Sequence, residues 1–537
     1  MKLLVTAVAL ALVPCRAVFA AAQAPAPAKP AVSAKADAAL AALGAVRETD
    51  PKYPPVVYAR LKNGMQVVIL ERKMSPTISF NVFFKVGNVD NPVGKTGLAH
   101  LFEHMIFKGT KTIGSKDFSK EKPLMDKVEK IGQAIYAEQL KGPEADQKKI
   151  DAMRKDLMAA EEAAGKFIER NEYQKVFQSL GAVGLNAMTS NDYTGYVLSL
   201  PANQVERWMV VESDRFRNPV LREFYKERDV VLEEMRMNDS QPRGLLWKHL
   251  LAYGFMSHPY RNPIIGWESD ISRLTRTDAE EYFKTYYGPN NATVAIVGDV
   301  DAAATIKLLK KYFEGIPARP VPQILKTEDP APTAEKRVAV FFKAEPMLAL
   351  GYRVPGSSSS DYPALFMTAS VLSSGRTGRL YKNLVEGSQV AAGIGAGSGT
   401  PGVRYPNLFI FIGAPRAPHT VAELESGVYG ELHKLWQQPP SQEELQKIVN
   451  QYEADIIKEM EQNMGMAHTL AYSQMIQGDW RYDWQLLEKL RSVKPEDVSR
   501  VTAKYFTRSN RTVVWLENPE TPAPAPAAPA AGKENKQ

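Results

Sequence analysis

The chain has 537 residues, a formal net charge of +7 and a single cysteine, Cys15. This length exceeds what one hydrophobic core usually organises, so at least two domains are expected. Basic and acidic residues are interleaved throughout, and no basic patch with interleaved aromatics is present, which argues against nucleic acid as a partner. Beyond the N-terminal residues no apolar run is long enough to cross a bilayer, so no membrane span is expected.

The N-terminal residues have the pattern of a secretory signal peptide. Lys2 precedes an apolar run over 3–13, and a small-residue cleavage pattern ends at Ala20. We therefore expect residues 1–20 to be removed and the mature protein to be secreted into the periplasm. Cys15 would leave with this segment, so any metal in the mature protein must be held by His, Asp or Glu.

Three Pro-rich segments predict the domain organisation. Residues 21–50 are rich in Ala and Pro and are expected to form a flexible or polyproline-like leader. Residues 317–335 are expected to link two domains, 51–316 and 336–517. Residues 518–537 are expected to form a disordered tail.

Apolar periodicity predicts strands and amphipathic helices in both halves. Residues 66–71 and 78–85 are expected to form the two strands of a hairpin, followed by a loop and a helix over 98–107. Further strands are predicted at 292–297, 338–342, 408–412 and 512–516, and further helices at 222–238, 278–286, 422–436, 442–464 and 495–505. This mixture, present twice, predicts an α+β fold.

Residues 120–177 form a charged segment with a helical pattern and a turn at Lys141-Gly142-Pro143. Its apolar positions follow alternating steps of three and four residues, as in a coiled-coil seam: Ile150, Met153, Leu157, Ala160, Ala164 and Phe167. We expect a helical hairpin inserted into the first domain. Its role is open between a packing arm and a surface that binds a partner.

The two halves contain an internal repeat. The segment from Thr277 to Val294 recurs from Glu496 to Val513, at a constant separation of 219 residues. Each copy predicts a helix that ends in two aromatic residues, a polar turn and an apolar strand. Residues 366–370 stand in the second half where 100–104 stand in the first, and they contain no metal ligands. We therefore expect a duplication followed by loss of the chemistry in the second copy.

The clearest functional pattern is His100-Leu101-Phe102-Glu103-His104. On a helix the two histidines lie one turn apart on one face, where two ring nitrogens can bind a single metal ion. Glu103 is placed to take a proton from water at that ion. The order H-x-x-E-H is the inverted form of the H-E-x-x-H zincin motif. The alternative is two histidines on a polar helix face beside an unrelated glutamate.

A zinc hydrolase needs a third protein ligand and an open position for water. The best source is the helix over 223–238, in which Glu227 and Glu234 lie two turns apart on one face. Glu233 is the rival ligand, although it points about a quarter turn away.

The motif, with several further blocks, resembles the pitrilysin/insulinase (M16) family of zinc peptidases. It is most similar to half-length bacterial members related to mitochondrial processing peptidase subunits. The matching blocks after the motif are Met105 to Thr110, Gly184 to Thr194, Glu227 to Glu234, His258 to Gly266 and Leu372 to Tyr381. The resemblance covers roughly residues 53–517 and implies two homologous α+β modules that form half of a clamshell, the second of them inactive.

The resemblance also implies a metal site. His100, His104 and Glu234 would bind Zn²⁺, one ion per chain, and Glu103 would be the catalytic general base. Glu227 would hold a ligand histidine in place from behind.

The implied substrate is a peptide or an unfolded protein segment. Asn186 would contact the substrate backbone, while the strand around it pairs with an extended peptide. The implied function is therefore a zinc-dependent endopeptidase.

Two features depart from the family pattern. The gap from His104 to Glu234 is 130 residues, longer than usual, and the inserted hairpin would explain it. Active members often carry an Arg and a Tyr in the second half that hold the substrate, whereas the aligned positions here are Val385 and Ala392. A homologous partner chain, either a second copy or a zinc-free chain carrying that pair, would complete a dimeric clamshell.

Two other functions stay open. One is a non-catalytic M16-like assembly or partner subunit of a peptidase complex, although such relatives have usually lost the metal motif that this chain keeps. The other is a zinc hydrolase of a non-peptide amide, which would use the same metal chemistry.

Overall fold

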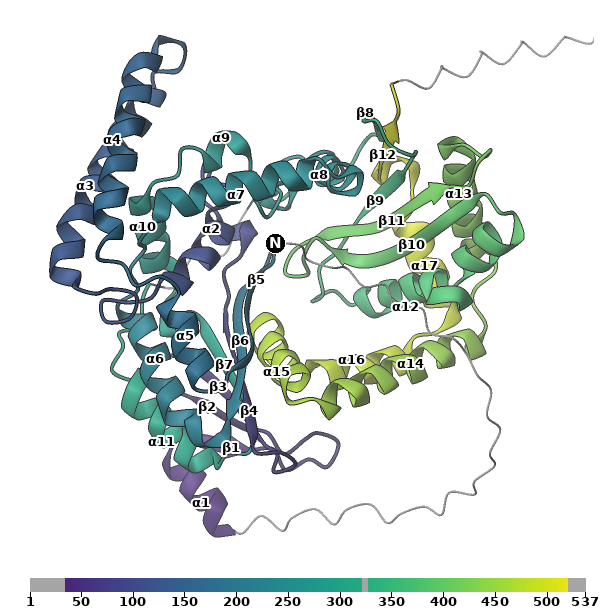
Figure 1. Ribbon diagram of the computed structural model, residues 1–537. Coiled ribbons are helices and arrows are strands. Elements are labelled where there is room, and N and C mark those ends of the chain that lie inside the picture. The colour runs from purple at the N-terminus through teal and green to yellow at the C-terminus, as the bar shows by residue number, and fades with distance from the viewer. Residues whose placement is uncertain (1–33, 321–326, 520–537) are drawn as a thin grey trace, which may run out of the picture.

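The computed structural model describes residues 34–320 and 327–519, which form two sheet-containing domains (Figure 1). The predicted signal peptide and most of the predicted tail lie outside the described residues. The strands are β1 (Ala45–Arg47), β2 (Val57–Arg60), β3 (Gln66–Glu71), β4 (Thr77–Phe84), β5 (Val183–Thr189), β6 (Thr194–Pro201), β7 (Ala292–Gly298), β8 (Lys336–Phe341), β9 (Leu348–Val354), β10 (Ala391–Thr400), β11 (Asn407–Pro415) and β12 (Arg511–Glu517). Together with the helices they confirm the α+β fold of two modules.

Helices cover the sheets and fill the space around them. The first domain contains α1 (Ala34–Ala42), α2 (Leu98–Met105), α3 (Phe118–Gln139), α4 (Gln147–Gly165), α5 (Glu172–Ser179), α6 (Val205–Arg217), α7 (Phe224–Asp239), α8 (Pro242–Gly254), α9 (Glu268–Ile271), α10 (Arg276–Tyr286) and α11 (Ala302–Phe313). The second contains α12 (Tyr362–Ser373), α13 (Val421–Gln437), α14 (Gln442–Glu461), α15 (Asn463–Gln477), α16 (Tyr482–Ser492) and α17 (Pro495–Tyr505).

The two sheets have related topologies. The first has the strand order β1-β2-β3-β7-β4-β6-β5 and the second the order β10-β11-β9-β12-β8. β7 pairs parallel with β3 and antiparallel with β4, and β12 pairs in the same way with β8 and β9. The side-chain amides of Asn291 and Asn510 each donate to a tyrosine carbonyl five residues earlier, Tyr286 and Tyr505. The internal repeat is thus visible down to single hydrogen bonds.

The predicted hairpin of residues 66–71 and 78–85 is wrong. Both strands exist, but β7 lies between them and pairs with each. Every residue of β7 is buried, as expected for a strand in the middle of a sheet with both faces covered. β3 and β4 therefore each pair with a strand more than two hundred residues away in the chain. The short connection between β3 and β4 gives no sign of this.

Each domain contributes a helix to the sheet of the other. α15, from the second domain, packs on β4 and β7 of the first sheet, where Met466 and Leu470 are buried with Val68 and Val297. α8, from the first domain, packs on β9 and β12 of the second sheet. Because both faces of each sheet are covered only after this exchange, the two domains form one interlocked body (Figure 1).

The prediction of a flexible leader is wrong for its described part. Residues 34–42 form α1, where Leu40 is 2% exposed and the helix packs near α11. β1 then joins the first sheet antiparallel to β2. Alanine favours helix strongly, so an Ala-rich segment folds where an apolar surface is available to pack against.

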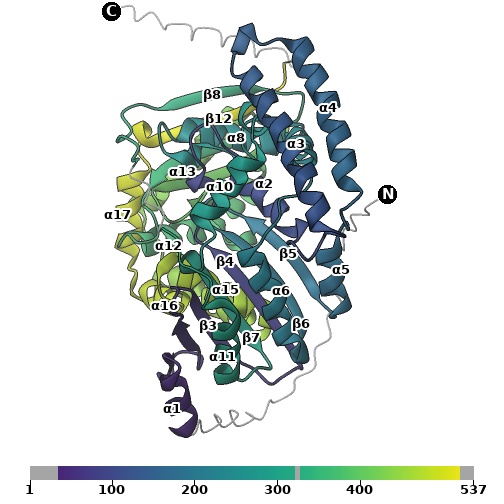
Figure 2. The ribbon, with the colours of Figure 1, turned by 90° about the vertical axis from the view of Figure 1, so that its left-hand side faces the viewer.

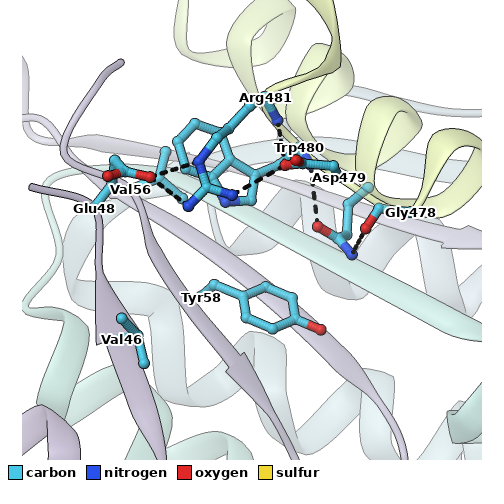
Figure 3. Close-up of a pocket in the computed structure, with 9 residues that line it drawn as sticks. Val46, Glu48, Val56, Tyr58, Gly478, Asp479, Trp480 and Arg481 are labelled. Atoms are coloured by element: carbon cyan, nitrogen blue, oxygen red, sulfur yellow. Dashed lines mark hydrogen bonds and ion pairs between the residues drawn. The ribbon is translucent and has the colours of Figure 1, made fainter. Parts of the chain in front are cut away.

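The segment after β1 is also tied to the second domain. Glu48 forms an ion pair with Arg481, whose guanidinium lies over the Trp480 ring with 4.6 Å to its centroid. Figure 3 shows these side chains in a pocket whose other lining residues include Val46, Val56, Tyr58, Gly478 and Asp479. The charges in this pocket pair with each other, so the pocket serves the contact between domains.

A helical hairpin of α3 and α4 projects from the first domain (Figures 1 and 2). Four of the six predicted seam residues are buried, namely Ile150, Leu157, Ala160 and Ala164, whereas Met153 is half-buried and Phe167 lies beyond the end of α4. The hairpin itself runs over 118–165, somewhat short of the predicted 120–177. Among the described residues, none of the helices combines the length and apolar character needed to cross a membrane.

Candidate metal centre

The face of α2 that carries the motif is selected by packing. Leu98, Leu101, Phe102 and Met105 have no exposed surface, so this side of the helix lies in the core. The remaining side therefore presents the two histidines and Glu103 to a common open space. The rings of His100 and His104 lie next to each other, with 4.8 Å between their centroids.

The start of α2 is held by the block His258 to Gly266 and by the helix that follows it. Gly97 has φ of +82°, and a Cβ there would lie 2.4 Å from the carbonyl oxygen of Ile265. Thr96 donates its amide and its hydroxyl to Asp270 at 3.1 and 2.7 Å. This anchoring places the first turn of α2, and therefore His100.

The second group of candidate residues lies on α7. Val231, Leu232 and Met235 are buried against the core, which turns Glu227 and Glu234 toward α2. Glu234 Oε2 is 3.8 Å from His100 Nε2 and 3.9 Å from His104 Nε2.

Three donor atoms converge at this point. One ligand atom from each of His100, His104 and Glu234 lies within 4.8 Å of the others. The separations from Glu234 exceed hydrogen-bonding distance, and two imidazole nitrogens with one carboxylate are a donor set that suits Zn²⁺. The residues present therefore fit a zinc ion.

The rival ligand Glu233 takes no part in this group. It is exposed and forms an ion pair with Arg236 at 3.3 Å. Both residues are glutamates, so what distinguishes them is the side of α7 on which each lies: Glu234 faces α2 and Glu233 does not.

Burial and neighbouring charges shift the pKa values of the two histidines in opposite directions. Burial, with a smaller effect from His104, lowers the pKa of His100 to about 4, so its ring is neutral at pH 7 and can bind metal. Burial opposes protonation of His104 as well, but the hydrogen bond and charge of Glu227, with those of Glu103 and Glu234, raise its pKa.

Glu227 orients His104. The Nδ1 atom of His104 lies 3.0 Å from Glu227 Oε1, which directs Nε2 toward Glu234. Lys108 Nζ lies 2.6 Å from the other carboxylate oxygen of Glu227. The hydrogen bond from His104, and then Lys108, lower the pKa of Glu227 to about 2. Lys108 was not predicted, although its position four residues after His104 was a usable signal.

Glu103 is held from the other side of the site. The hydroxyl of Thr189 donates to Glu103 Oε2 at 2.7 Å. Burial raises the pKa of Glu103, and the contacts with Thr189 and His104 offset this only in part. Thr189 lies in a block that resembles the family, but nothing in the sequence indicated its contact with Glu103.

Asn186 lies on β5, the last strand of the first sheet, and this strand contacts α2. Its side chain is exposed, and Val183 on the same strand is 71% exposed. β5 pairs only with β6 in this sheet, so its outer edge can accept another strand. In the second domain Val385 is buried and Ala392 is exposed on β10, so neither offers a polar side chain.

Family models match most of the described chain. Residues 67–138 and 158–268 match the family described as insulinase (peptidase family M16), and residues 273–452 match the peptidase M16 inactive domain. The gap at 139–157 falls on the outer part of the α3–α4 hairpin. The boundary at 273 precedes β7, so the family models and the two sheets divide the chain at different points.

Relatives in sequence and solved structures point to the same family as the family models. The zinc protease PqqE of Helicobacter pylori is 28% identical over 495 residues, covering 89% of this chain and 96% of that protein. A probable mitochondrial-processing peptidase subunit beta of Arabidopsis thaliana is 23% identical over 57% of this chain and 48% of that protein. The crystal structure of a protease from Helicobacter pylori has a TM-score of 0.72 at 25% identity, covering 87% of this chain and 100% of that one. The chain therefore belongs to peptidase family M16, with the inverted motif in its insulinase domain and an inactive domain after it.

Proposed function

We propose that this chain is a zinc-dependent endopeptidase that hydrolyses peptides or unfolded protein segments. The observation that carries the proposal is the meeting of His100, His104 and Glu234 with the Glu103 carboxylate beside them. Membership of a family that contains zinc proteases supports it.

The side chains of the site have distinct chemical roles. A zinc ion held by the three ligands would supply Lewis acidity toward a peptide carbonyl and toward water. Glu103, which stands outside the ligand set, accepts the proton of the attacking water and returns it to the leaving amine. Thr189 holds one oxygen of that carboxylate and leaves the other for the proton. The raised pKa of Glu103 makes it a stronger base than an exposed glutamate.

The substrate lies along β5. An extended peptide that pairs with the outer edge of this strand would pass the metal site, with Asn186 as a contact to its backbone. An edge strand recognises backbone groups and not a folded surface, which favours peptides and unfolded segments as substrates. Such recognition is largely independent of side chains.

A homologous partner chain would complete the substrate site, because Val385 and Ala392 provide no side-chain donor. A second copy of this chain would lack the same pair, so the missing donors favour a zinc-free homologous chain that carries the Arg and Tyr. The isolated chain should then be weakly active and gain activity when the zinc-free chain is added, measured by hydrolysis across a titration of that chain, with sedimentation to follow complex formation. Full activity of a purified monomer would contradict this.

Export to the periplasm follows from the sequence pattern of residues 1–20. N-terminal sequencing of protein recovered from a periplasmic fraction tests it, with cleavage after Ala20 as the expected result.

Glu103→Gln tests the proposed function. Hydrolysis of an unstructured peptide should fall by at least a hundredfold, while zinc content stays at the wild-type level because the ligands are unchanged. Glu233→Gln is the matched control, because Glu233 lies on α7 but outside the donor group. This variant should keep wild-type hydrolysis and wild-type zinc content. Unchanged hydrolysis in Glu103→Gln would exclude the assigned role, and zinc binding without any hydrolysis by the wild type and its partner would favour the assembly-subunit alternative.

A further inference from the structure

A loop of the inactive second domain reaches the turn that follows the substrate strand. This loop joins β10 to β11 and approaches the end of β5 (Figure 1). The side-chain amide of Asn191 donates to the carbonyl of Pro401 at 3.2 Å. The backbone amides of Val403 and Arg404 donate to Asp192 Oδ2 at 2.6 and 3.2 Å.

Arg404 adds a charged contact to the same turn. Its Nη1 atom donates to the Asp192 carbonyl at 3.2 Å and to Asp90 Oδ2 at 3.1 Å. The side chains of Arg404 and Asp90 are only 12% and 10% exposed, and Asp192 is 3% exposed. Because this pair is shielded from water, removal of the guanidinium would leave the Asp90 carboxylate without its ion-pair partner.

The fit of the loop leaves no room for a side chain at its centre. A Cβ on Gly402 would lie 2.5 Å from the hydroxyl of Tyr260 and 2.6 Å from Asp192 Oδ2. On the other side of the turn, a Cβ on Gly87 would lie 2.6 Å from the carbonyl oxygens of Ser190 and Asn191. The turn is therefore held between one loop of each domain.

This turn connects directly to the catalytic centre. Thr189, the last residue of β5, precedes it and donates to Glu103. The amide of Ser190 donates to the Tyr193 carbonyl at 2.8 Å, which makes the turn a single closed unit. A shift of residues 190–192 would therefore move Thr189 and the end of the β5 edge together.

We propose that Arg404 is a positioning residue of the active site, through which the inactive domain holds the end of the substrate strand in register with Glu103. The inactive domain thus has a second role besides covering the sheet of the first. The kinetic part of this inference rests on the proposed peptidase function, whereas its structural part does not.

The test compares Arg404→Met with Arg404→Lys and with a matched control, Arg481→Met. Arg481 also forms an ion pair between the domains, with Glu48, but at the opposite edge of the first sheet. Hydrogen–deuterium exchange is measured over residues 183–193 of the zinc-loaded proteins, and kcat and KM are measured on an unstructured peptide with any partner chain present.

In Arg404→Met, exchange over residues 183–193 should accelerate about tenfold, the size expected for loss of one charged hydrogen bond. KM should rise by a similar factor, with zinc content unchanged. Arg404→Lys should recover part of both effects, because an ammonium reaches one of the two acceptors. Arg481→Met should lower the melting temperature without changing exchange over residues 183–193 or KM.

Wild-type exchange over residues 183–193 in Arg404→Met would overturn the proposal, as would an equal acceleration in Arg481→Met. If Arg404→Met does not fold, the decision rests on Arg404→Lys, for which unchanged exchange and unchanged KM overturn it. If the wild type hydrolyses no peptide, the proposed function fails. The exchange measurement still decides whether Arg404 holds the turn of residues 190–192 in place.

Discussion

His104 Nδ1 and Glu227 Oε1 lie 3.0 Å apart although 123 positions separate them in the chain. This contact fixes which ring nitrogen of His104 faces the metal site, because Nδ1 is engaged with the carboxylate. It also joins α2 to α7, the two helices that supply the ligands. The orientation of a ligand therefore depends on a residue that does not bind the metal.

Glu227→Ala should weaken zinc binding by about 10–100-fold, the usual effect of removing the partner of a ligand histidine. Competition with a chelator of known affinity measures this. Glu233→Ala removes an exposed acid from the same helix and should leave the affinity unchanged. Equal affinities in the two variants would contradict a role for Glu227.

Thr189→Val should move the acid limb of the pH–rate profile to higher pH. The hydroxyl of Thr189 donates to Glu103 and so lowers the pKa of that carboxyl. Its removal raises the pKa further, and a base acts only when deprotonated, so activity is lost at a higher pH as the solution is acidified. Ser199→Ala, which removes a hydroxyl pair with Ser79 in the same sheet, is the control and should leave the profile in place.

Gly97→Ala should destabilise the protein and weaken zinc binding more than Gly94→Ala. Both glycines have positive φ, +82° and +75°, so both substitutions carry the cost of a left-handed residue, about 1–2 kcal/mol. Only at Gly97 does the new Cβ meet backbone, whereas nothing lies within 4 Å at Gly94. Urea unfolding and zinc titration compare the pair, and equal losses would show that the close approach to Ile265 is unimportant.

Zinc should stabilise the folded chain. At a free concentration of 100 times its Kd, the free energy of unfolding should rise by about 2.7 kcal/mol, and a chelator should reverse this. Glu234→Gln replaces the anionic carboxylate ligand by a neutral amide and should lose most of the effect at the same concentration. Stabilisation of equal size in this variant would place the metal elsewhere.

The ligand pair and the neighbouring base could be predicted from five residues. Helical geometry alone brings positions four apart onto one face, and the apolar residues between them decide which face is open. The repeat around Thr293 and Thr512 was equally visible, because each copy keeps its helix, turn and strand together in the chain.

Other features could not be predicted, for different reasons. α15 lies between the sheet of one domain and helices of the other, and polar residues such as Ser473 and Gln474 are buried there with the apolar ones, so the helix lacks the amphipathic pattern expected of a surface helix. The predicted β-hairpin of 66–71 and 78–85 rests on the tendency of consecutive strands to pair. In the structure β7 lies between β3 and β4, so these two strands do not pair with each other. The described part of the leader forms a helix that the sequence did not predict, because an Ala-rich helix of this length is stable only when it packs against an apolar surface.

The sequence alone determines the positions of His100, Glu103 and His104, because residues three and four apart lie on one face of a helix. Tertiary packing brings the partners to these residues: Glu234 and Glu227, which the resemblance implied, and Lys108, Thr189 and a loop of the inactive domain, which it did not. Apart from Lys108, which follows His104 by four residues, each of these contacts joins residues far apart in the chain. Such contacts depend on how whole elements pack, and packing is a property of the assembled domains that no short spacing encodes.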